Sequence, residues 1–457
     1  MRLRSGLMLS GIFMAGLAIG TVAQPLQHAM GQNASEDSTY QQLSLFGDVL
    51  TQVKENYVID PPSDKLIYNA VNGMLAGLDP HSSYMNQQQY ADMQVQTTGE
   101  FGGLGLEVTE ASGLLKVISP IDDTPGAKAG IKPGDIIVEI NGHSTDGLGL
   151  DNAVAKMRGA PGTQITLTLK RNGVSTPVHI TLTREIIKIQ DVKDRLLPTP
   201  AGQIGYIRLD SFDENADPHI RDAVKALKKQ ANGNIRGYIL DMRDNPGGLL
   251  DQAVAVSDDF LNSGEIVSTH GRHSQDDAVW YAQEGDITNG APIVVLTNTG
   301  TASAAEIVTA ALQQNRRALV LGTKTFGKGS VQTIMPIDDE GALRLTTALY
   351  FTPSGKSIQG YGVTPDVTVS DTRAPDDAFA QLRETDLLNS FTNPTGQSAT
   401  PLPPAPPLPT TASTIPNKPP AKWPDFDPAN PSTDFQLQMG IKLIATMLPP
   451  TTTTASN

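Results

Sequence analysis

The sequence predicts a multidomain α+β protein with an α/β core, an inserted mostly β domain and a helical N-terminal region. Three changes of pattern along the chain support this. Apolar residues recur at three- and four-residue spacing in residues 36–97, as in helices. Short alternating runs separated by glycine turns fill residues 98–186, as in a small β domain. Strands and helices alternate through residues 187–370, which indicates a layered α/β structure.

The composition excludes several classes of protein. The 457-residue chain carries a net charge of −14, which argues against a nucleic-acid partner because nucleic-acid binding needs a basic surface. The chain has no cysteine, which excludes thiol catalysis, thiolate zinc sites, iron–sulfur clusters and disulfides.

The first 23 residues have the pattern of an export segment. Arg2 and Arg4 precede an apolar run over residues 7–23 that ends in small residues. We expect residues 1–23 to be a signal peptide or an uncleaved anchor in the inner membrane, and the protein to be exported to the periplasm. A buried N-terminal helix is the alternative.

The region that follows predicts two core-forming helices. One apolar stripe runs through Leu43, Phe46, Val49, Leu50, Val53 and Tyr57. Asp60-Pro61-Pro62 ends that helix, and Ser63 or Asp64 can cap the second.

Within residues 98–186, two short helices are expected near residues 127–129 and over residues 150–157.

The α/β core is expected to alternate regularly. Strands are predicted at residues 204–209, 235–242, 292–297, 318–321, 330–335 and 343–350, and helices at residues 216–230, 249–261 and 303–314.

Residues 371–457 are expected to form a proline-rich spacer followed by one amphipathic helix. The spacer includes the run 401–407, and the helix has apolar residues from Phe435 to Met447. We expect this helix to dock on a partner protomer or on the N-terminal helices and so to set assembly. Packing on its own core is the alternative.

Ser303 is the first candidate for chemistry. A buried strand ends, Gly300 permits a tight turn, and a helix begins at the serine. The free amides and the dipole of a helix N-terminus could stabilise an oxyanion there. The alternative is that Ser303 and Glu306 form only a capping box.

Lys328 is the candidate base. None of the seven histidines lies in a recognisable serine-protease motif. Lys328 lies between two glycines with no acid from residue 323 to residue 337, so burial could lower the pKa of its amine. In a following strand Gln332 would share its face and could orient the amine. A phosphate-binding loop is a competing interpretation of Gly322, Gly327 and Lys328, but Gly329 stands where such loops have Ser or Thr.

These residues together resemble the carboxy-terminal processing proteases, tail-specific serine peptidases, over residues 38–369. Residues 301–306 are similar to the family's nucleophile motif. Ser303, Lys328 and Gln332 match its Ser–Lys–Gln triad. Residues 241–248 are similar to its Asn-Pro-Gly-Gly turn, so the resemblance implies an oxyanion hole of the Gly247 and Ala304 amides. Residues 79–84 match a further marker, which we interpret as a helix end and a turn.

The inserted β domain resembles a PDZ domain. Gly103, Leu104, Gly105 and Leu106 stand where such domains bind a terminal carboxylate, and residues 129–142 are similar to that fold's core. Unpaired loop amides and an open strand edge would capture a peptide tail by strand addition.

The resemblance therefore implies a serine endopeptidase that recognises protein C-termini and needs neither a metal nor a cofactor. Its expected partners are proteins or peptides with free C-termini, further copies of the chain, and an adaptor protein. Two alternatives stay open. One is a non-catalytic PDZ adaptor with a protease-like body, and the other is a nucleotide-binding ATPase.

Overall fold

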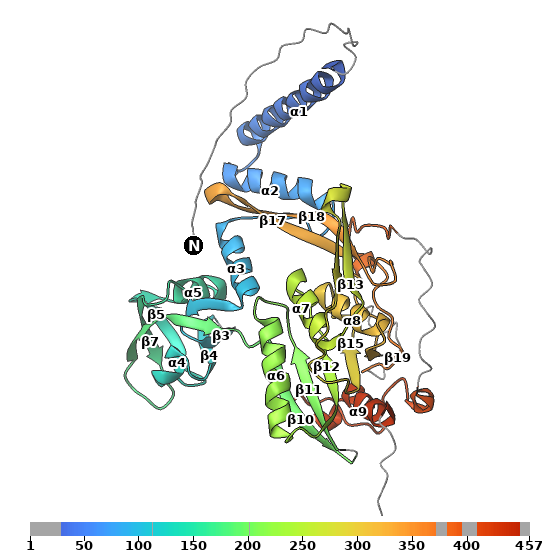
Figure 1. The fold of residues 1–457 in the computed structure, drawn as a ribbon. Coiled ribbons are helices and arrows are strands. Elements are labelled where there is room, and N and C mark those ends of the chain that lie inside the picture. The colour runs from blue at the N-terminus through green and yellow to red at the C-terminus, as the bar shows by residue number, and fades with distance from the viewer. Residues whose placement is uncertain (1–28, 112, 201, 372–381, 395–408, 448–457) are drawn as a thin grey trace, which may run out of the picture. The chain divides into compact units, whose positions relative to one another are not determined.

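The computed structural model describes residues 29–111, 113–200, 202–371, 382–394 and 409–447 (Figure 1). The chain divides into two compact units, residues 1–70 and residues 71–457, which we describe separately. The predicted export segment 1–23 and the proline-rich run 401–407 lie outside the described residues. Within the described ranges, no helix combines the length and the apolar character needed to cross a membrane.

The first unit contains α1 (Ala29–Asn56) and the beginning of α2 (Ser63–Ala76). The prediction that this apolar stripe forms a core is wrong, because Leu43, Phe46, Val49 and Tyr57 are all exposed. An amphipathic pattern shows that a helix has an apolar face, but it does not show that the same chain covers that face.

Residues 71–98 are less helical than expected. Between α2 and α3 (Gln87–Thr98) lies a short strand, β1 (Ser83–Met85), which pairs antiparallel with β18 (Gly341–Phe351). The sequence pattern missed β1 because its hydrogen-bonding partner lies far along the chain. α3 begins at an Asn86–Gln89 capping box and ends at Gly99, whose φ of 67° favours glycine.

The inserted domain is a β-sheet with two small helices. β2 (Glu100–Gly103) pairs with β9 (Glu185–Lys188) where the chain enters and leaves. The main sheet has the order β3-β4-β5-β7-β8, with β6 paired to β5. Its elements are β3 (Leu106–Ala111), β4 (Leu114–Pro120), α4 (Pro125–Lys128), β5 (Ile136–Ile140), β6 (His143–Ser144), α5 (Leu150–Met157), β7 (Gln164–Lys170) and β8 (Val178–Thr183). The helix predicted at residues 150–157 has those bounds.

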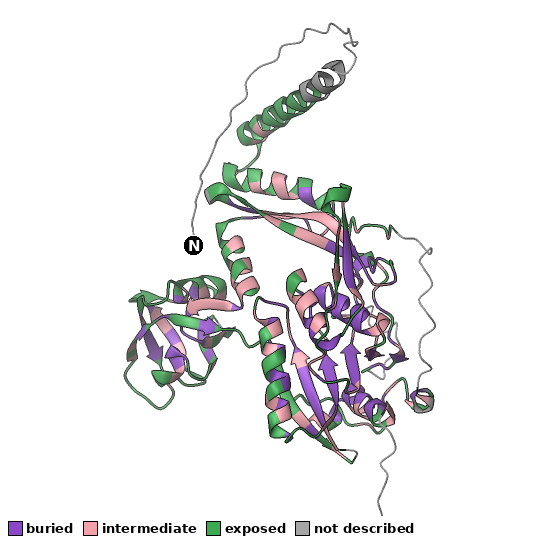
Figure 2. Cartoon of the chain, in the orientation of Figure 1, coloured by how far each residue is buried: buried purple, intermediate pink, exposed green. Residues whose placement is uncertain are grey.

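A six-stranded sheet forms the centre of the α/β core, in the order β10-β11-β12-β15-β16-β19. β10 is antiparallel to β11, and every later pair is parallel. Figure 2 shows that the strands β11, β12 and β15 are largely buried. The strands are β10 (Val192–Thr199), β11 (Gly202–Leu209), β12 (Ile235–Asp241), β15 (Ile293–Thr297), β16 (Ala318–Gly322) and β19 (Val367–Thr368).

Helices cover both faces of this sheet, and the period of two along β15 shows how. Ile293 and Val295 pack in the cluster with α6 (Ala216–Gln230), α7 (Leu250–Phe260) and α8 (Ala304–Gln314). Val294 and Leu296 pack instead with α9 (Phe435–Met447). The expectation that α9 docks on a partner or on the N-terminal helices is therefore wrong, because its apolar face covers its own sheet.

A second sheet has the order β1-β18-β13-β14, with β17 paired to β18. β13 spans Glu265–Gly271, β14 spans Ala278–Tyr281 and β17 spans Ser330–Ile337. The mixed α+β class is confirmed.

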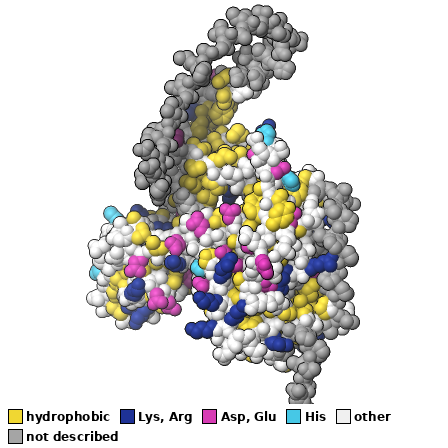
Figure 3. All heavy atoms as spheres, viewed as in Figure 1, with side chains coloured by type: hydrophobic (Ala, Val, Ile, Leu, Met, Phe, Trp, Pro, Cys, Tyr) yellow, Lys and Arg dark blue, Asp and Glu magenta, His cyan; other side chains and the backbone are white. Residues whose placement is uncertain are grey.

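On the viewed surface, acidic and basic side chains are intermixed (Figure 3).

Candidate active site

Ser303 lies in a strained turn between β15 and α8. Its φ of 55° and ψ of −119° are values that residues with a side chain rarely adopt. The Ser303 N–H donates to Glu306 Oε2 at 2.9 Å. Among the described residues, the N–H of Ala304 has no hydrogen-bond acceptor. The turn therefore presents a hydroxyl beside one unpaired amide at a helix N-terminus.

Lys328 lies just before β17, where the residue as a whole is half-buried and its amine is the more deeply enclosed part. Burial, and then the charge of Arg344, lower the pKa of Lys328 to about 8, although Glu384, Glu306 and Asp79 act in the opposite direction. Lys328 Nζ donates to Gln332 Oε1 at 2.7 Å. The amine is thus held by a neutral acceptor in surroundings that favour its deprotonated form.

The loop that carries Lys328 is joined to the turn that carries Ser303. Phe326 N–H donates to Thr301 O at 3.0 Å, and Lys328 N–H donates to Glu306 Oε2 at 2.9 Å. Within the described residues, Lys328 Nζ makes no direct hydrogen bond to the Ser303 hydroxyl. The structure therefore brings the two segments together without closing the contact between their side chains.

Sequence reasoning missed Tyr350 on β18. Its hydroxyl hydrogen-bonds the Lys328 carbonyl and also contacts the Ser303 side chain. Burial raises the pKa of Tyr350 well above its ordinary value, so the phenol stays neutral. A tyrosine on a strand otherwise predicted only as core gave no signal of this contact.

The turn at residues 245–248 packs directly against Ser303. A Cβ on Gly247 would lie 2.7 Å from Ser303 Cβ and 2.9 Å from Ala304 N, so only glycine fits there. The Gly247 N–H already donates to Asn245 Oδ1 at 2.9 Å. Among the described residues, the Gly248 N–H has no acceptor. Of these two N–H groups, that of Gly248 is therefore the one available to another acceptor.

The glycine loop of the inserted domain borders a cavity of about 120 Å³. Its lining is mostly apolar and comprises Phe101, Gly103, Leu104, Gly105, Leu106, Val108, Val154, Met157 and Arg158. The Arg158 guanidinium lies 5.0 Å from the Phe101 ring centroid, and its Nη1 donates to Asp92 at 2.8 Å. Arg158 Nε is buried and finds no partner among the described residues, so one donor of the cavity wall is unused there.

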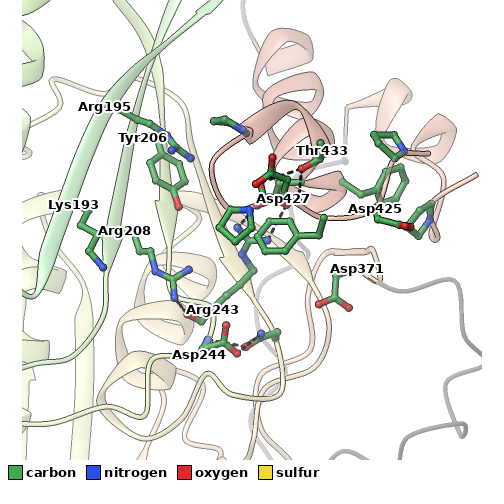
Figure 4. A pocket seen from close by; sticks show the side chains of 18 of the residues that line it. Lys193, Arg195, Tyr206, Arg208, Arg243, Asp244, Asp371, Asp425, Asp427 and Thr433 are labelled. Atoms are coloured by element: carbon green, nitrogen blue, oxygen red, sulfur yellow. Dashed lines mark hydrogen bonds and ion pairs between the residues drawn. The ribbon is translucent and has the colours of Figure 1, made fainter. Parts of the chain in front are cut away.

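A larger cavity of about 840 Å³ lies between β10–β11 and residues 419–435 (Figure 4). Neither Ser303 nor Lys328 lines it. Lys193 and Arg208 on its wall pair with Asp210. Its basic side chains are thus partly neutralised by its own acids.

In the described part of the chain, no group of three or more His, Asp or Glu side chains could hold a metal ion.

Comparisons with known proteins found two family models and several similar proteases. The peptidase family S41 model matches residues 203–369, and a PDZ domain model matches residues 116–171. The chain is 52% identical over 358 residues to a carboxy-terminal-processing protease of Bartonella bacilliformis, covering 78% of this chain and 81% of that protein. It is 36% identical over 342 residues to the carboxy-terminal processing protease CtpA of Bacillus subtilis, covering 74% of this chain and 71% of that protein. A solved photosystem II D1 C-terminal processing protease is 31% identical, with 71% of this chain and 92% of that chain covered and a TM-score of 0.41.

Proposed function

Because the chain belongs to the carboxy-terminal processing proteases of peptidase family S41, we propose that it cleaves proteins near their free C-termini with Ser303 as nucleophile and Lys328 as general base. One observation carries the proposal. The Lys328 amine, with a pKa lowered to about 8, lies on a loop bound to the same carboxylate that binds the Ser303 amide.

The reaction would proceed through an acyl-enzyme. Neutral Lys328 takes the proton of Ser303 as Oγ attacks the scissile carbonyl carbon. The resulting ammonium then gives that proton to the leaving amine as the carbon–nitrogen bond breaks. Water then attacks the acyl carbonyl carbon as it loses a proton to Lys328. The Lys328 ammonium returns that proton to Ser303 Oγ as the ester bond breaks and the new C-terminal acid leaves. The side-chain contact between Ser303 and Lys328 would tighten only when substrate is bound, as is common in serine enzymes.

The oxyanion would be held by two amides. Ala304 N–H supplies the first. We assign the second to the turn at Gly247 and Gly248, and we favour the Gly248 N–H because that of Gly247 already donates to Asn245. Donors fixed before the reaction stabilise the charge that develops on the carbonyl oxygen.

The PDZ domain would bind the substrate's tail. The loop over residues 103–106 borders an apolar cavity, which suits a C-terminal apolar side chain with its carboxylate on the loop amides. The unused Arg158 Nε donor lies on the same wall. We further propose that the chain is exported through residues 1–23, forms homo-oligomers and works with an adaptor. A non-catalytic PDZ adaptor is the alternative to the enzyme.

The test compares wild type with Ser303→Ala and Lys328→Arg. Each is incubated with a periplasmic extract, and new C-termini are mapped by mass spectrometry. We expect products only with wild type, because arginine keeps the charge of Lys328 but cannot act as a base. A quenched peptide ending in free valine should also be cleaved faster than its C-terminal amide. Products from the Ser303→Ala protein would overturn the enzyme, and equal cleavage of acid and amide would overturn tail recognition.

A further inference from the structure

The turn that follows α2 is connected to Gln332 through one side chain of β18. β1 pairs with β18 in the register Ser83 to Arg344, and this pairing brings the turn against that strand. Asp79 is 2% exposed, and its Oδ1 accepts a hydrogen bond from Thr346 Oγ1 at 3.1 Å. Thr346 Oγ1 in turn accepts from Gln332 Nε2 at 3.1 Å. The sequence alone indicated only a helix end and a turn here.

The direction of these hydrogen bonds follows from Asp79. Its two oxygens also accept from the His81 N–H at 2.8 Å, the Ser82 N–H at 2.9 Å and the Ser82 hydroxyl at 2.6 Å. Although burial favours the neutral acid, the hydrogen bonds from Ser82, the His81 amide and Thr346 hold the pKa of Asp79 below its ordinary value. An ionised carboxylate only accepts, so Thr346 must donate its single proton to Asp79.

The amide of Gln332 is thereby given one orientation. Because the Thr346 hydroxyl proton points to Asp79, the Thr346 oxygen can only accept from Gln332. The amide nitrogen of Gln332 must therefore face it. The Gln332 nitrogen also donates to Ser330 Oγ at 3.0 Å. The Gln332 oxygen is left facing Lys328 Nζ, from which it accepts at 2.7 Å.

This orientation decides what the lysine can do. A neutral amine has two N–H donors and one lone pair. When the Gln332 oxygen faces the amine, Lys328 uses one N–H to donate to it, and the lone pair stays unoccupied. With the amide reversed, the Gln332 nitrogen would donate to the lone pair and occupy it.

We propose that Asp79 and Thr346 are positioning residues that fix the Gln332 amide and so keep the lone pair of Lys328 free to take the Ser303 proton. This inference rests on the proposed function. It gives Asp79 and Thr346 a role in the reaction that acts through Gln332 and Lys328.

A pH profile separates this role from a purely structural one. The charges that act on Lys328 are Arg344 on β18, Glu306 on α8, Asp79, and Glu384 in the 3₁₀ turn Glu384–Asp386. Loss of the Asp79 charge, or of the Gln332 oxygen as acceptor, removes an interaction that favours the ammonium, so the pKa of Lys328 falls further. A general loosening would instead hydrate the amine and raise its pKa toward 10.5.

The experiment uses the full chain and four variants: Thr346→Val, Thr346→Ser, Asp79→Asn and Thr347→Val. Thr347→Val is the matched control, because the Thr347 hydroxyl lies one residue further along β18 and pairs with Thr333 on the exposed side of the sheet. Turnover of the free-valine peptide is measured from about pH 6 to about pH 10, a range that brackets the titration of Lys328.

We expect kcat to fall about tenfold to a hundredfold in Thr346→Val and Asp79→Asn, with KM little changed. The pH at which kcat rises should be the same as in wild type or lower. Thr346→Ser keeps the hydroxyl and should restore most of the turnover, and Thr347→Val should stay near wild type. The inference is overturned if Thr346→Val matches Thr346→Ser, or if the rise moves to higher pH.

A second measurement does not depend on catalysis. In the Ser303→Ala background, the rate at which an amine-reactive reagent labels Lys328 is followed against pH by mass spectrometry. Adding Asp79→Asn should lower the labelling midpoint, and a raised midpoint would contradict the inference. If Ser303→Ala and Lys328→Arg stay active, the proposed function itself fails. If they are inactive while Thr346→Val is normal, only the positioning role fails.

Discussion

Glu306 Oε2 accepts the backbone N–H of Lys328 at 2.9 Å, so a carboxylate on α8 holds the loop of the candidate base. The same carboxylate accepts from the N–H groups of Ser303 and Gly327 and from the Thr325 hydroxyl. The Val363 N–H donates to Thr325 Oγ1, so the hydroxyl proton is free to go to Glu306. Burial raises the pKa of Glu306 to about 7, but these four donors favour its ionised form.

Glu306→Gln should destabilise the core and slow turnover. Its amide nitrogen would take the place of Oε1 or of Oε2 and could not accept from the two donors there. These are the Gly327 N–H and the Thr325 hydroxyl at Oε1, or the Ser303 and Lys328 N–H groups at Oε2. Two buried donors left unpaired should lower the free energy of unfolding by about 2–4 kcal/mol in total. Denaturant unfolding measures this, with Glu185→Gln as the control because the Glu185 side chain is exposed and pairs with Lys128 on the surface. An unfolding curve like that of wild type would show that the Glu306 carboxylate does not hold the loop.

Lys328→Met should abolish turnover and yet stabilise the fold at neutral pH. The pKa of Lys328 is about 8 in the folded chain against 10.5 for a free lysine. Between pH 8 and pH 10.5, Lys328 is protonated in the unfolded chain but not in the folded one, so the free energy of unfolding of wild type rises with pH over this range. The destabilisation caused by burying the lysine is therefore greatest below pH 8. Methionine removes that penalty, roughly 1–2 kcal/mol after allowance for partial exposure.

Thermal melts at neutral and at alkaline pH test this prediction. The Met variant should melt higher than wild type at pH 7, and the gap should narrow as the pH approaches 10.5, where both states of wild type lose the proton. A lower melting temperature for the Met variant at neutral pH would mean that the amine contributes more through its bond to Gln332 than it loses by burial.

Local patterns predicted most of the α/β core. The helix expected at residues 216–230 is α6 with the same bounds, because its apolar stripe and its ends are visible in the sequence. The bond from Lys328 to Gln332 joins residues only four apart, which is why a strand period could suggest it. Whether these residues catalyse a reaction stays a proposal.

Contacts between distant segments could not be predicted in this way. Thr346 and Asp79 are 267 positions apart, and no local pattern relates them. The apolar faces of α1 and α9 look alike in the sequence, yet α9 covers its own sheet and the α1 stripe is exposed. Hydrophobic periodicity identifies a face, whereas topology decides what packs on it.

Arg243→Ala should weaken the attachment of α9 to the core and destabilise the fold. Arg243 Nη2 pairs with Asp241 Oδ2 at 2.6 Å and with Asp434 Oδ2 at 2.7 Å, and Asp434 lies just before α9. Asp241 is fully buried and would keep the Tyr206 hydroxyl and the more distant Arg208. Loss of Arg243 should therefore cost about 3 kcal/mol, the lower end of the range for a broken buried pair. Lys193→Ala breaks an exposed pair with Asp210 and should cost at most about 1 kcal/mol. Equal unfolding free energies for the two variants would contradict this account of how α9 is held.

The strain at Ser303 can be measured apart from its chemistry. Ser303→Gly and Ser303→Ala both lack the hydroxyl, so both should be inactive and differ only in backbone preference. At a φ of 55° and a ψ of −119°, the Cβ of alanine is strained and glycine is not. We expect the glycine variant to be the more stable by roughly 1 kcal/mol, a difference that denaturant unfolding can resolve.

The matched pair at Ser257 should show the opposite order. Ser257 lies inside α7, where alanine is favoured over glycine by about 1 kcal/mol. Ser257→Ala should therefore be more stable than Ser257→Gly, while the order is reversed at Ser303. If alanine is the more stable at both positions, the turn at Ser303 stores no strain, and the serine adopts its position at no cost to the fold.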